Sequence, residues 1–320
     1  MTDAVAALGE LVPVALAFGA GAVFARRKII QAQDSRIFSD FAFLFAIPCY
    51  LFGNIYASDL RVLFDWQAIG GYAATAALAT VVVGVTARRL GKSSRGVAMR
   101  IMAGVQVNTA YFAVPVFVML FGDAAPIFPI LLLQVCLLTV VVISIMEFDG
   151  ADHEAEDAEG SGRAAKLGRA VWASLNTPVV LACNLGIVLN LLSVRMPGPV
   201  LDGFAFVGAA AAPVALFALG LHLGGTGIAV RATTKEEIAL IGFKCVVFPL
   251  AVYALCGWVF EVERPWLDYL VLIAAMPAPQ NLFIFAQRYR VDEELSASLV
   301  VKSSVVTLIL LPLWVQVVHT

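Results

Sequence analysis

Apolar stretches of about 20 residues recur along nearly the whole chain, and each is long enough to cross the roughly 30 Å hydrocarbon core of a bilayer. Only 14% of the 320 residues are charged, against about 25% in a typical soluble domain. Stretches such as 66–87 and 296–318 hold too few polar residues to give a helix a water-facing side, which argues against a soluble α/β protein. The sequence therefore predicts an integral membrane protein.

Ten of these stretches are predicted to span the membrane as helices, because the short alternating runs of a transmembrane barrel do not occur in them. The predicted fold class is an all-α polytopic membrane protein with ten transmembrane helices. The predicted spans cover residues 8–25, 37–56, 66–87, 98–121, 124–146, 171–193, 203–223, 237–259, 266–287 and 296–318.

The basic residues predict how these helices are oriented. With the N-terminus outside, the inner connections carry sixteen Lys and Arg residues and the outer connections carry three, and cytoplasmic loops show such an excess. The basic cluster at 26–28 follows the first apolar stretch, which is not the order found in a cleaved signal peptide. We therefore expect a multi-pass protein of the cell membrane (plasma or inner membrane) with both termini outside.

Two pairs of segments match at a single offset of 165 residues. PVALAFGAG at 13–21 matches PVVLACNLG at 178–186, and AIPCYLF at 46–52 matches AAPVALF at 211–217. Either match alone is weak in a chain rich in Ala and Leu, but both share the same offset. The sequence therefore predicts an internal repeat.

The predicted repeats are two five-helix units at 8–146 and 171–318, joined by an acidic cytoplasmic linker at 147–170. Because five is an odd number, the second unit starts from the opposite side of the membrane and is inverted. Inverted repeats are typical of secondary transporters, whose substrate site lies near the midplane and is often built from discontinuous helices.

Two predicted spans contain polar residues and prolines near their middle, in QVNTAYFAVPVF at 106–117 and MPAPQNLFIF at 276–285. Pro115, Pro277 and Pro279 are predicted to interrupt these helices, since proline lacks a backbone N–H. The freed backbone groups must then line protein or a watery cavity. Each downstream half-helix presents the positive end of its dipole, about half an elementary charge, so two such ends predict an anion site.

Six polar side chains in the predicted spans are expected to bind the substrate or to set the charge around it. The amides and the hydroxyl provide neutral donors, although they could equally satisfy the freed backbone groups. The two lysines are functional candidates because charge is costly in hydrocarbon, and snorkelling to an interface is their alternative. These residues are Asn108, Thr109, Gln280, Asn281, Lys244 and Lys302.

No acidic residue is expected as deep in the spans as these lysines, so no carboxylate-based Na⁺ site or proton relay is predicted. Na⁺ could still bind through carbonyls and amides, which leaves the coupling ion open between H⁺ and Na⁺. The five cysteines lack metal-ligand spacing and no phosphate-binding loop occurs, so we expect no metal, no cofactor and no nucleic-acid partner.

At these motifs the sequence resembles the auxin efflux carrier family, which includes the plant PIN auxin carriers and bacterial permeases. The resemblance covers most of the chain, and its best markers are N-T-x5-P at 108–115, PAPQNLFIFAQRY at 277–289, NTPVVLACNLGIVL at 176–189 and APVALFALG at 212–220. It implies a ten-helix inverted-repeat fold like that of the bile acid/sodium symporters. In that fold a scaffold part supports a transport part, and helices 4 and 9 cross at their breaks.

By position, the resemblance implies that Asn108, Pro115 and the segment 277–281 form the crossover site. It also implies organic anion substrates, such as indole carboxylates or dicarboxylates, and a homodimer formed through the scaffold. Lys302 departs from the family, where a small or apolar residue is expected. It could take the place of a coupling cation or supply a fixed positive charge to the substrate.

The sequence thus predicts a secondary transporter of a small organic anion, such as a mono- or dicarboxylate, working in the lipid bilayer by alternating access. An anion-binding membrane receptor or sensor without transport is the alternative. An enzyme is not expected, because the spans lack a Ser/His, paired-Asp or metal constellation.

Overall fold

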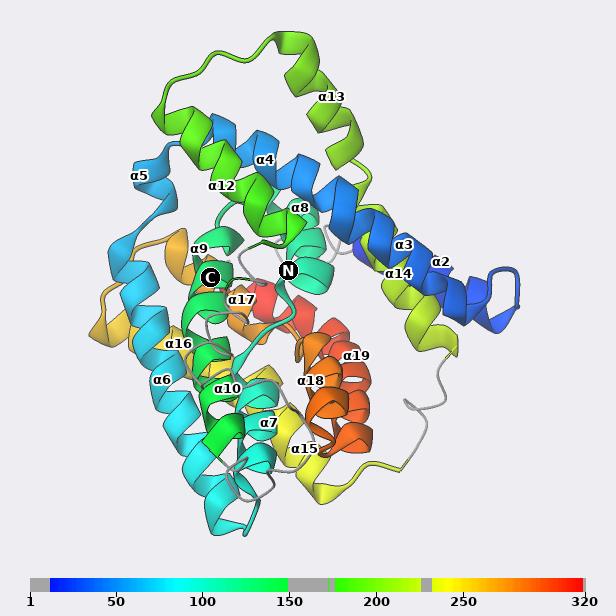
Figure 1. The fold of residues 1–320 in the computed structure, drawn as a ribbon, viewed down its shortest axis with the longest axis vertical. Coiled ribbons are helices and arrows are strands. Elements are labelled where there is room, and N and C mark those ends of the chain that lie inside the picture. The colour runs from blue at the N-terminus through cyan, green and yellow to red at the C-terminus, as the bar shows by residue number, and fades with distance from the viewer. Residues whose placement is uncertain (1–11, 149–171, 173–175, 226–231, 319–320) are drawn as a thin grey trace, which may run out of the picture.

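The computed structural model describes residues 12–148, 172, 176–225 and 232–318. All regular elements in this part of the chain are helices (Figure 1). The start of the first predicted span and the acidic linker from residue 149 onward lie outside the described residues.

The helices follow the apolar stretches in chain order. The first half carries α2 (Val12–Arg26), α3 (Ser35–Phe41), α4 (Ile47–Ala57), α5 (Leu60–Leu63), α6 (Trp66–Arg89), α7 (Ser94–Val105), α8 (Val114–Phe121), α9 (Ile127–Leu133) and α10 (Thr139–Phe148). The second half carries α12 (Pro178–Leu191), α13 (Gly198–Gly208), α14 (Ala211–Gly225), α15 (Lys235–Gly242), α16 (Phe248–Ala254), α17 (Trp266–Ala275), α18 (Asn281–Tyr289) and α19 (Glu293–Val318).

Short helical turns link several of these helices into longer runs. They are the 3₁₀ turn η1 (Ala32–Asp34) and the π turns η2 (Ala42–Ala46), η3 (Thr109–Ala113), η4 (Gln134–Leu138), η7 (Phe243–Val247) and η8 (Leu255–Val259).

Five helical runs are long and apolar enough to cross a membrane: Ala32–Ala57, Trp66–Arg89, Gly198–His222, Lys235–Val259 and Glu293–Val318. Their surfaces carry large apolar side chains, as on α6, where Leu78 is 52% and Val81 60% exposed. Such exposed apolar surface is stable in hydrocarbon and costly in water. The chain is therefore an all-helical, multi-pass membrane protein, while the count of ten spans stays a prediction.

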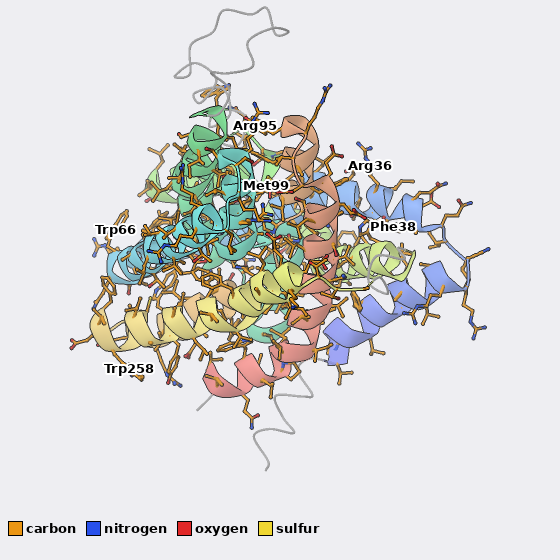
Figure 2. All side chains as sticks on the ribbon, turned by 90° about the horizontal axis from the view of Figure 1, so that it is seen from below. Arg36, Phe38, Trp66, Arg95, Met99 and Trp258 are labelled. Carbon is orange, nitrogen blue, oxygen red and sulfur yellow. The ribbon has the colours of Figure 1, made fainter. Side chains whose placement is uncertain are left out.

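Two exposed tryptophans lie near the same edge of the molecule. Trp66 begins α6 and Trp258 lies near the end of the run Lys235–Val259, and they are 75% and 76% exposed (Figure 2). Tryptophan is enriched where a membrane meets water. The predicted topology puts both residues at the outer interface, and this orientation stays a prediction.

Helix starts are set by short polar side chains at the ends of the apolar runs. Asp65 accepts a hydrogen bond from Ala68 N at the start of α6, and Ser93 accepts one from Gly96 N at the start of α7. Thr234 and Glu237 form a reciprocal capping box at the start of α15. Each cap satisfies backbone N–H groups that have no partner inside the helix.

The helices form two bundles, and each bundle takes helices from both halves of the chain (Figure 1). In the first bundle, α2 packs on α14 and α4 packs on α12 and α13. The second bundle contains α6, α7, α8 and α10 together with the run from α15 to α19, and α8 joins it through the rings of Phe117 and Phe121, which pack on Tyr269 of α17. The main contacts between the bundles join α14 and α2 to α8.

The helix pairs α2–α14 and α12–α4 make the same close approach. At Gly21 a Cβ atom would overlap the backbone oxygen of Phe217, and at Gly186 it would lie 3.1 Å from the backbone oxygen of Phe52. The 165-residue offset relates the two contacts: Gly21 corresponds to Gly186, and Phe52 corresponds to Phe217. A side chain at Gly21 would collide with the facing backbone and one at Gly186 would press on it, so glycine at both positions favours the close approach.

One end of the second bundle is held together by a buried arginine. Arg100 on α7 is 4% exposed and donates to Glu236 Oε1 at 2.5 Å and to Asp292 Oδ2 at 2.6 Å. Lys92 Nζ also reaches Glu236, at 2.9 Å. These ion pairs, which we call the Arg100 network, connect α7 with the starts of α15 and α19.

Candidate substrate site

The first interruption separates α7 from the turn η3 and α8. The chain leaves the helix after Val105, and residues 106–108 carry no helical structure. Gln134 Oε1 accepts from Val107 N at 2.8 Å, and Asn108 O accepts from Ala113 N at 2.9 Å. Pro115 does not lie at the interruption itself but farther along, in the first turn of α8, which directly continues the π turn η3.

The second interruption separates α17 from α18. Residues 276–280 leave the helix, and Pro277 and Pro279 cannot donate to the carbonyls four residues earlier. Ser303 and Thr307 of α19 bind the freed groups: Ala278 N donates to Ser303 Oγ at 3.1 Å, and Thr307 Oγ1 donates to Ala275 O at 3.2 Å. The interruption is therefore stabilised by side chains of the neighbouring helix, as buried polar groups require.

The two interruptions touch each other. Asn108 N donates to Pro277 O at 2.9 Å, and residues 106–108 and 276–279 are buried. One non-helical segment from each half of the chain thus meets at a single point inside the second bundle. Because backbone polar groups inside a membrane protein must be paired or face a watery cavity, this meeting point is the candidate substrate site.

The predicted neutral side chains lie around this point with different exposure. Asn108 is 3% exposed, Thr109 and Gln280 are half-buried, and Asn281 is exposed at the start of α18. The residues Thr109 and Asn281 begin the two downstream helical segments, so the positive ends of both dipoles are at this site.

Lys244 lies beside the second interruption. It is 1% exposed, its Nζ donates to Ala274 O at 3.2 Å, and it sits 4.8 Å from the centre of the Phe248 ring. Ala274 is in the last turn of α17, so the ammonium contacts the carbonyl end of the interrupted helix.

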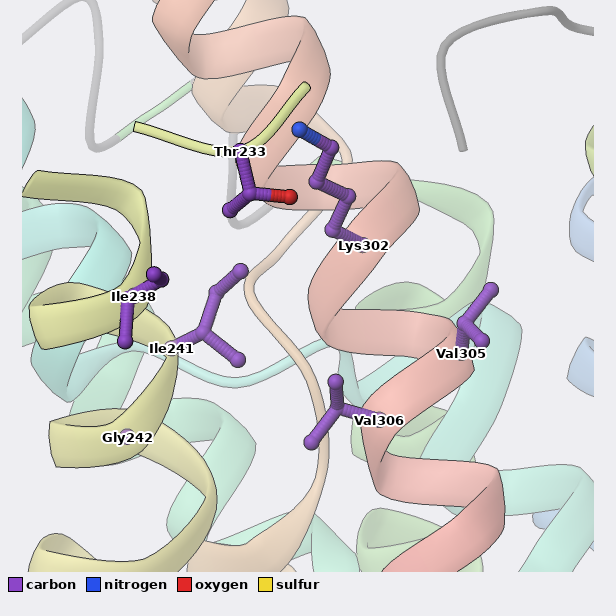
Figure 3. Close-up of a pocket in the computed structure, with 7 residues that line it drawn as sticks. All are labelled: Thr233, Ile238, Ile241, Gly242, Lys302, Val305 and Val306. Atoms are coloured by element: carbon purple, nitrogen blue, oxygen red, sulfur yellow. The ribbon is translucent and has the colours of Figure 1, made fainter. Parts of the chain in front are cut away.

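Lys302 faces a different region, although it is next to Ser303 in the sequence. Its Nζ pairs with Glu237 Oε2 at 3.3 Å and lies 3.5 Å from Ala232 O. It lines a cavity of about 400 Å³ between α15 and α19, with Thr233, Ile238, Ile241, Gly242, Val305 and Val306 (Figure 3). The structure therefore places Lys244, rather than Lys302, against the interrupted helix.

Two buried polar residues were not anticipated, one at the meeting point and one at the Lys302 pocket. Gln134 lies on the turn η4 and is 6% exposed; within the described residues its Nε2 has no hydrogen-bond partner. Glu237 lies at the start of α15, is 5% exposed and is the buried carboxylate that pairs with Lys302. The capping pattern T-x-x-E at 234–237 marks Glu237 as a helix-start residue, whereas Gln134 is a lone amide in an apolar stretch.

No group of three or more His, Cys, Asp and Glu side chains is placed to hold a metal ion in the described part of the chain. Cys49, Cys183, Cys245 and Cys256 are free thiols.

The chain matches the family model described as "Membrane transport protein" over residues 6–315. It is similar to a protein named "Putative malonate transporter" from Rhizobium meliloti, with 31% identity over 121 residues, which cover 37% of this chain and 36% of that protein. It is also similar to the "Uncharacterized transporter YfdV" of Escherichia coli, with 23% identity and 97% of both chains covered. An "Uncharacterized transporter" of Methanothermobacter thermautotrophicus is 22% identical, over 89% of this chain and 90% of that one.

Proposed function

This chain belongs to the membrane transport protein family, that of the auxin efflux carriers which its motifs resemble, and from this premise we propose that it is a secondary transporter of a small organic anion. The anion crosses the bilayer by alternating access, and its binding site is the point where the two interrupted helices meet.

The hydrogen bond from Asn108 N to Pro277 O carries this proposal. It brings the start of the segment leading into α8 against the segment leading into α18. The positive ends of two helix dipoles then converge on one buried region, where a negative group is stabilised. Discontinuous helices that present such ends to an anion are a common design of secondary transporters.

The neutral side chains at this point have the chemistry that a carboxylate needs. Asn108 and Asn281 offer amide donors from the two sides of the meeting point, and Thr109 and Gln280 add a hydroxyl and a further amide. Lys244 adds positive charge beside the second interruption. Lys302 lies farther from the meeting point and affects the charge around the anion as part of its ion pair with Glu237. Pro277 and Pro279 keep the second helix interrupted, and Pro115 lies inside the helical segment that begins at Thr109 after the first interruption.

Two observations support alternating access. Helices from both halves of the chain form each bundle, and the contacts Gly21–Phe217 and Gly186–Phe52 exchange under the 165-residue offset. Both are expected of two inverted repeats, at 8–146 and 171–318. In our proposal the bundle of α2, α4, α12, α13 and α14 is the scaffold, and the bundle with the site moves against it.

The same proposal assigns the orientation and assembly of the protein. Both termini lie outside the cell membrane, the linker at 147–170 is cytoplasmic, and the scaffold face pairs two copies into a homodimer. The excess of Lys and Arg on the inner connections supports the orientation. The homodimer rests on the family resemblance.

The name of the Rhizobium meliloti relative makes malonate the first substrate to test. Purified protein in liposomes should accumulate labelled malonate, or another mono- or dicarboxylate, under an imposed ion or substrate gradient. The variants Asn108→Ala and Asn281→Ala should each reduce this uptake by about tenfold, the effect of losing one hydrogen bond to a charged group.

Three outcomes separate the alternatives. Unchanged uptake by Asn108→Ala and Asn281→Ala would place the site elsewhere. Carboxylates that raise the thermal unfolding temperature but are never taken up would favour an anion receptor. Neither stabilisation nor uptake with any carboxylate would contradict the proposed anion specificity.

A further inference from the structure

The carbonyl end of α17 lacks the backbone donors that would complete the helix. The carbonyl of Ala275 faces position 279, where proline has no N–H to give, while the carbonyl of Ile273, which faces Pro277, accepts from Met276 N at 3.1 Å instead. Ala278 N, the partner expected for Ala274 O, donates to Ser303 Oγ instead. The last turn of α17 therefore presents carbonyl oxygens, with the negative end of the helix dipole behind them, to whatever lies beside it.

A lysine ammonium and a threonine hydroxyl occupy these oxygens. Lys244 Nζ donates to Ala274 O at 3.2 Å, and Thr307 Oγ1 donates to Ala275 O at 3.2 Å. Cys245 Sγ lies 3.5 Å from Thr307 Oγ1, which keeps this hydroxyl within a polar cluster between η7 and α19. The carbonyl end of α17 is therefore already filled by groups of the protein itself.

The charge of Lys244 is balanced differently from that of Lys302. Lys302 pairs with the buried carboxylate of Glu237. In the described part of the chain no ion pair to a carboxylate is found for Lys244, and its 1% exposure keeps water away. Its positive charge is stabilised by the carbonyl end of α17 and by the face of the Phe248 ring, whose centre lies 4.8 Å from Nζ, because both attract cations.

In transporters with discontinuous helices, the carbonyl ends and unwound carbonyls of the half-helices are where a monovalent coupling cation is coordinated. We propose that the ammonium of Lys244 is a built-in cation at this position, so that transport of the anion requires no free Na⁺. This inference rests on the proposed function and deepens it: the protein supplies the positive charge beside the anion, and no inorganic cation has to bind there first.

The first test uses the unaltered protein. Uptake of labelled malonate and of the other carboxylates into proteoliposomes is measured at one pH, with sodium chloride and then with choline chloride on both sides. We expect equal rates in the two salts. Uptake that requires Na⁺ would overturn this inference and leave the proposed transport intact. Absence of uptake in both salts would contradict the proposed function, and this inference with it.

The second test removes the charge while keeping the length of the side chain. In Lys244→Met the carbonyls of α17 and the Thr307 hydroxyl remain as oxygen ligands without their ammonium. Uptake in choline chloride should fall by about tenfold or more, the effect expected when a charged hydrogen-bond partner is lost. Sodium chloride should then raise both the uptake and the thermal unfolding temperature of this variant, because Na⁺ can enter the vacated position.

Lys235→Met is the matched control, since Lys235 is exposed and begins the same helical run. It should leave uptake unchanged in both salts. Lys244→Arg keeps a positive charge and should stay insensitive to Na⁺. If Lys244→Met is folded and transports at the normal rate in choline chloride, the inference is wrong; if it does not fold, the comparison of salts with the unaltered protein still decides.

Discussion

Gln134 is a buried side chain at the proposed site that the sequence did not single out. Its side-chain oxygen Oε1 accepts a hydrogen bond of 2.8 Å from the backbone N–H of Val107, the residue before Asn108. Its amide nitrogen is buried and has no hydrogen-bond partner among the described residues. A buried donor without a partner is costly, so this amide is available to a bound anion.

Two substitutions at Gln134 should separate its structural role from its role in binding. Gln134→Leu removes the acceptor for Val107 N and should lower the free energy of unfolding by about 1–3 kcal/mol, the cost of an unsatisfied buried amide. Gln134→Glu keeps an acceptor but adds negative charge, so it should stay folded and raise the KM for the carboxylate. Thermal unfolding and uptake kinetics measure the two effects; normal uptake by Gln134→Glu would contradict the proposed position of the anion.

Single-residue roles were predicted unevenly from the sequence. Asn108 was found because an amide near the middle of an apolar span is conspicuous, and it does lie where the interruptions touch. Of the two lysines the sequence favoured Lys302, which has Ser303 and Ser304 beside it, because a sequence does not tell which neighbour each side chain faces. Lys302 and Ser303 are neighbours in the sequence, but in the structure Lys302 points toward Glu237 and Ser303 points toward Ala278.

Among the elements, the apolar stretches predicted the helices well and the prolines predicted one interruption. The break at 276–280 follows from Pro277 and Pro279, which remove local hydrogen bonds. The break at 106–108 precedes Pro115, and it is held by long-range partners, Gln134 and Pro277, that lie far away in the sequence. Local sequence predicts local hydrogen bonds, and only the fold shows the distant ones.

Restoring a backbone donor at the second interruption should impair transport. In Pro279→Ala the new N–H can bond Ala275 O, in competition with Thr307 Oγ1, which favours extension of α17. We expect a stability equal to or above that of the unaltered protein, and a clear loss of carboxylate uptake. Pro312→Ala is the control, because Pro312 lies inside α19 and away from the interruption. Equal uptake by both variants would show that the interruption is not needed.

The Arg100 network should matter for stability through its buried arginine. Glu236 and Asp292 have side chains that are 32% and 34% exposed, whereas that of Arg100 is 5% exposed. The double substitution Glu236→Gln/Asp292→Asn leaves a buried charge without a counter-charge and should cost about 3–5 kcal/mol. Arg100→Met leaves carboxylates that water can reach and should cost less. Thermal unfolding of the purified variants should show this order, and the reverse order would contradict it.

At the level of the whole molecule, a side-chain hydrogen bond joins the two bundles. Tyr50 on α4 donates through its hydroxyl to the backbone oxygen of Gly122, which ends α8, at 2.9 Å. The sequence repeat predicted two halves, but the packing of helices from both halves into each bundle depends on tertiary contacts, such as those at Gly21 and Gly186. If the bundles move against each other, the Tyr50–Gly122 contact is made in only one orientation.

Removing this contact should change the balance between the two orientations of the transporter. Tyr50→Phe loses one neutral hydrogen bond, about 1 kcal/mol, which shifts the equilibrium by about fivefold. The ratio of the apparent affinities measured from the two faces of oriented vesicles should change by a similar factor. Tyr56→Phe is the control, because the Tyr56 hydroxyl donates to Val194 O within the first bundle. An unchanged ratio in Tyr50→Phe would argue against relative motion of the bundles.

Counterflow of a labelled carboxylate tests the central claim most directly, that one anion site alternates between the two faces of the membrane. Proteoliposomes loaded with unlabelled malonate, or with the carboxylate that gives the largest uptake, are diluted into a trace of the labelled compound. The account predicts transient accumulation of label above its equilibrium level, and at least about tenfold less accumulation in Asn108→Ala. The claim would be contradicted if the labelled carboxylate only reached its equilibrium level, or if Asn108→Ala accumulated as much label as the unaltered protein.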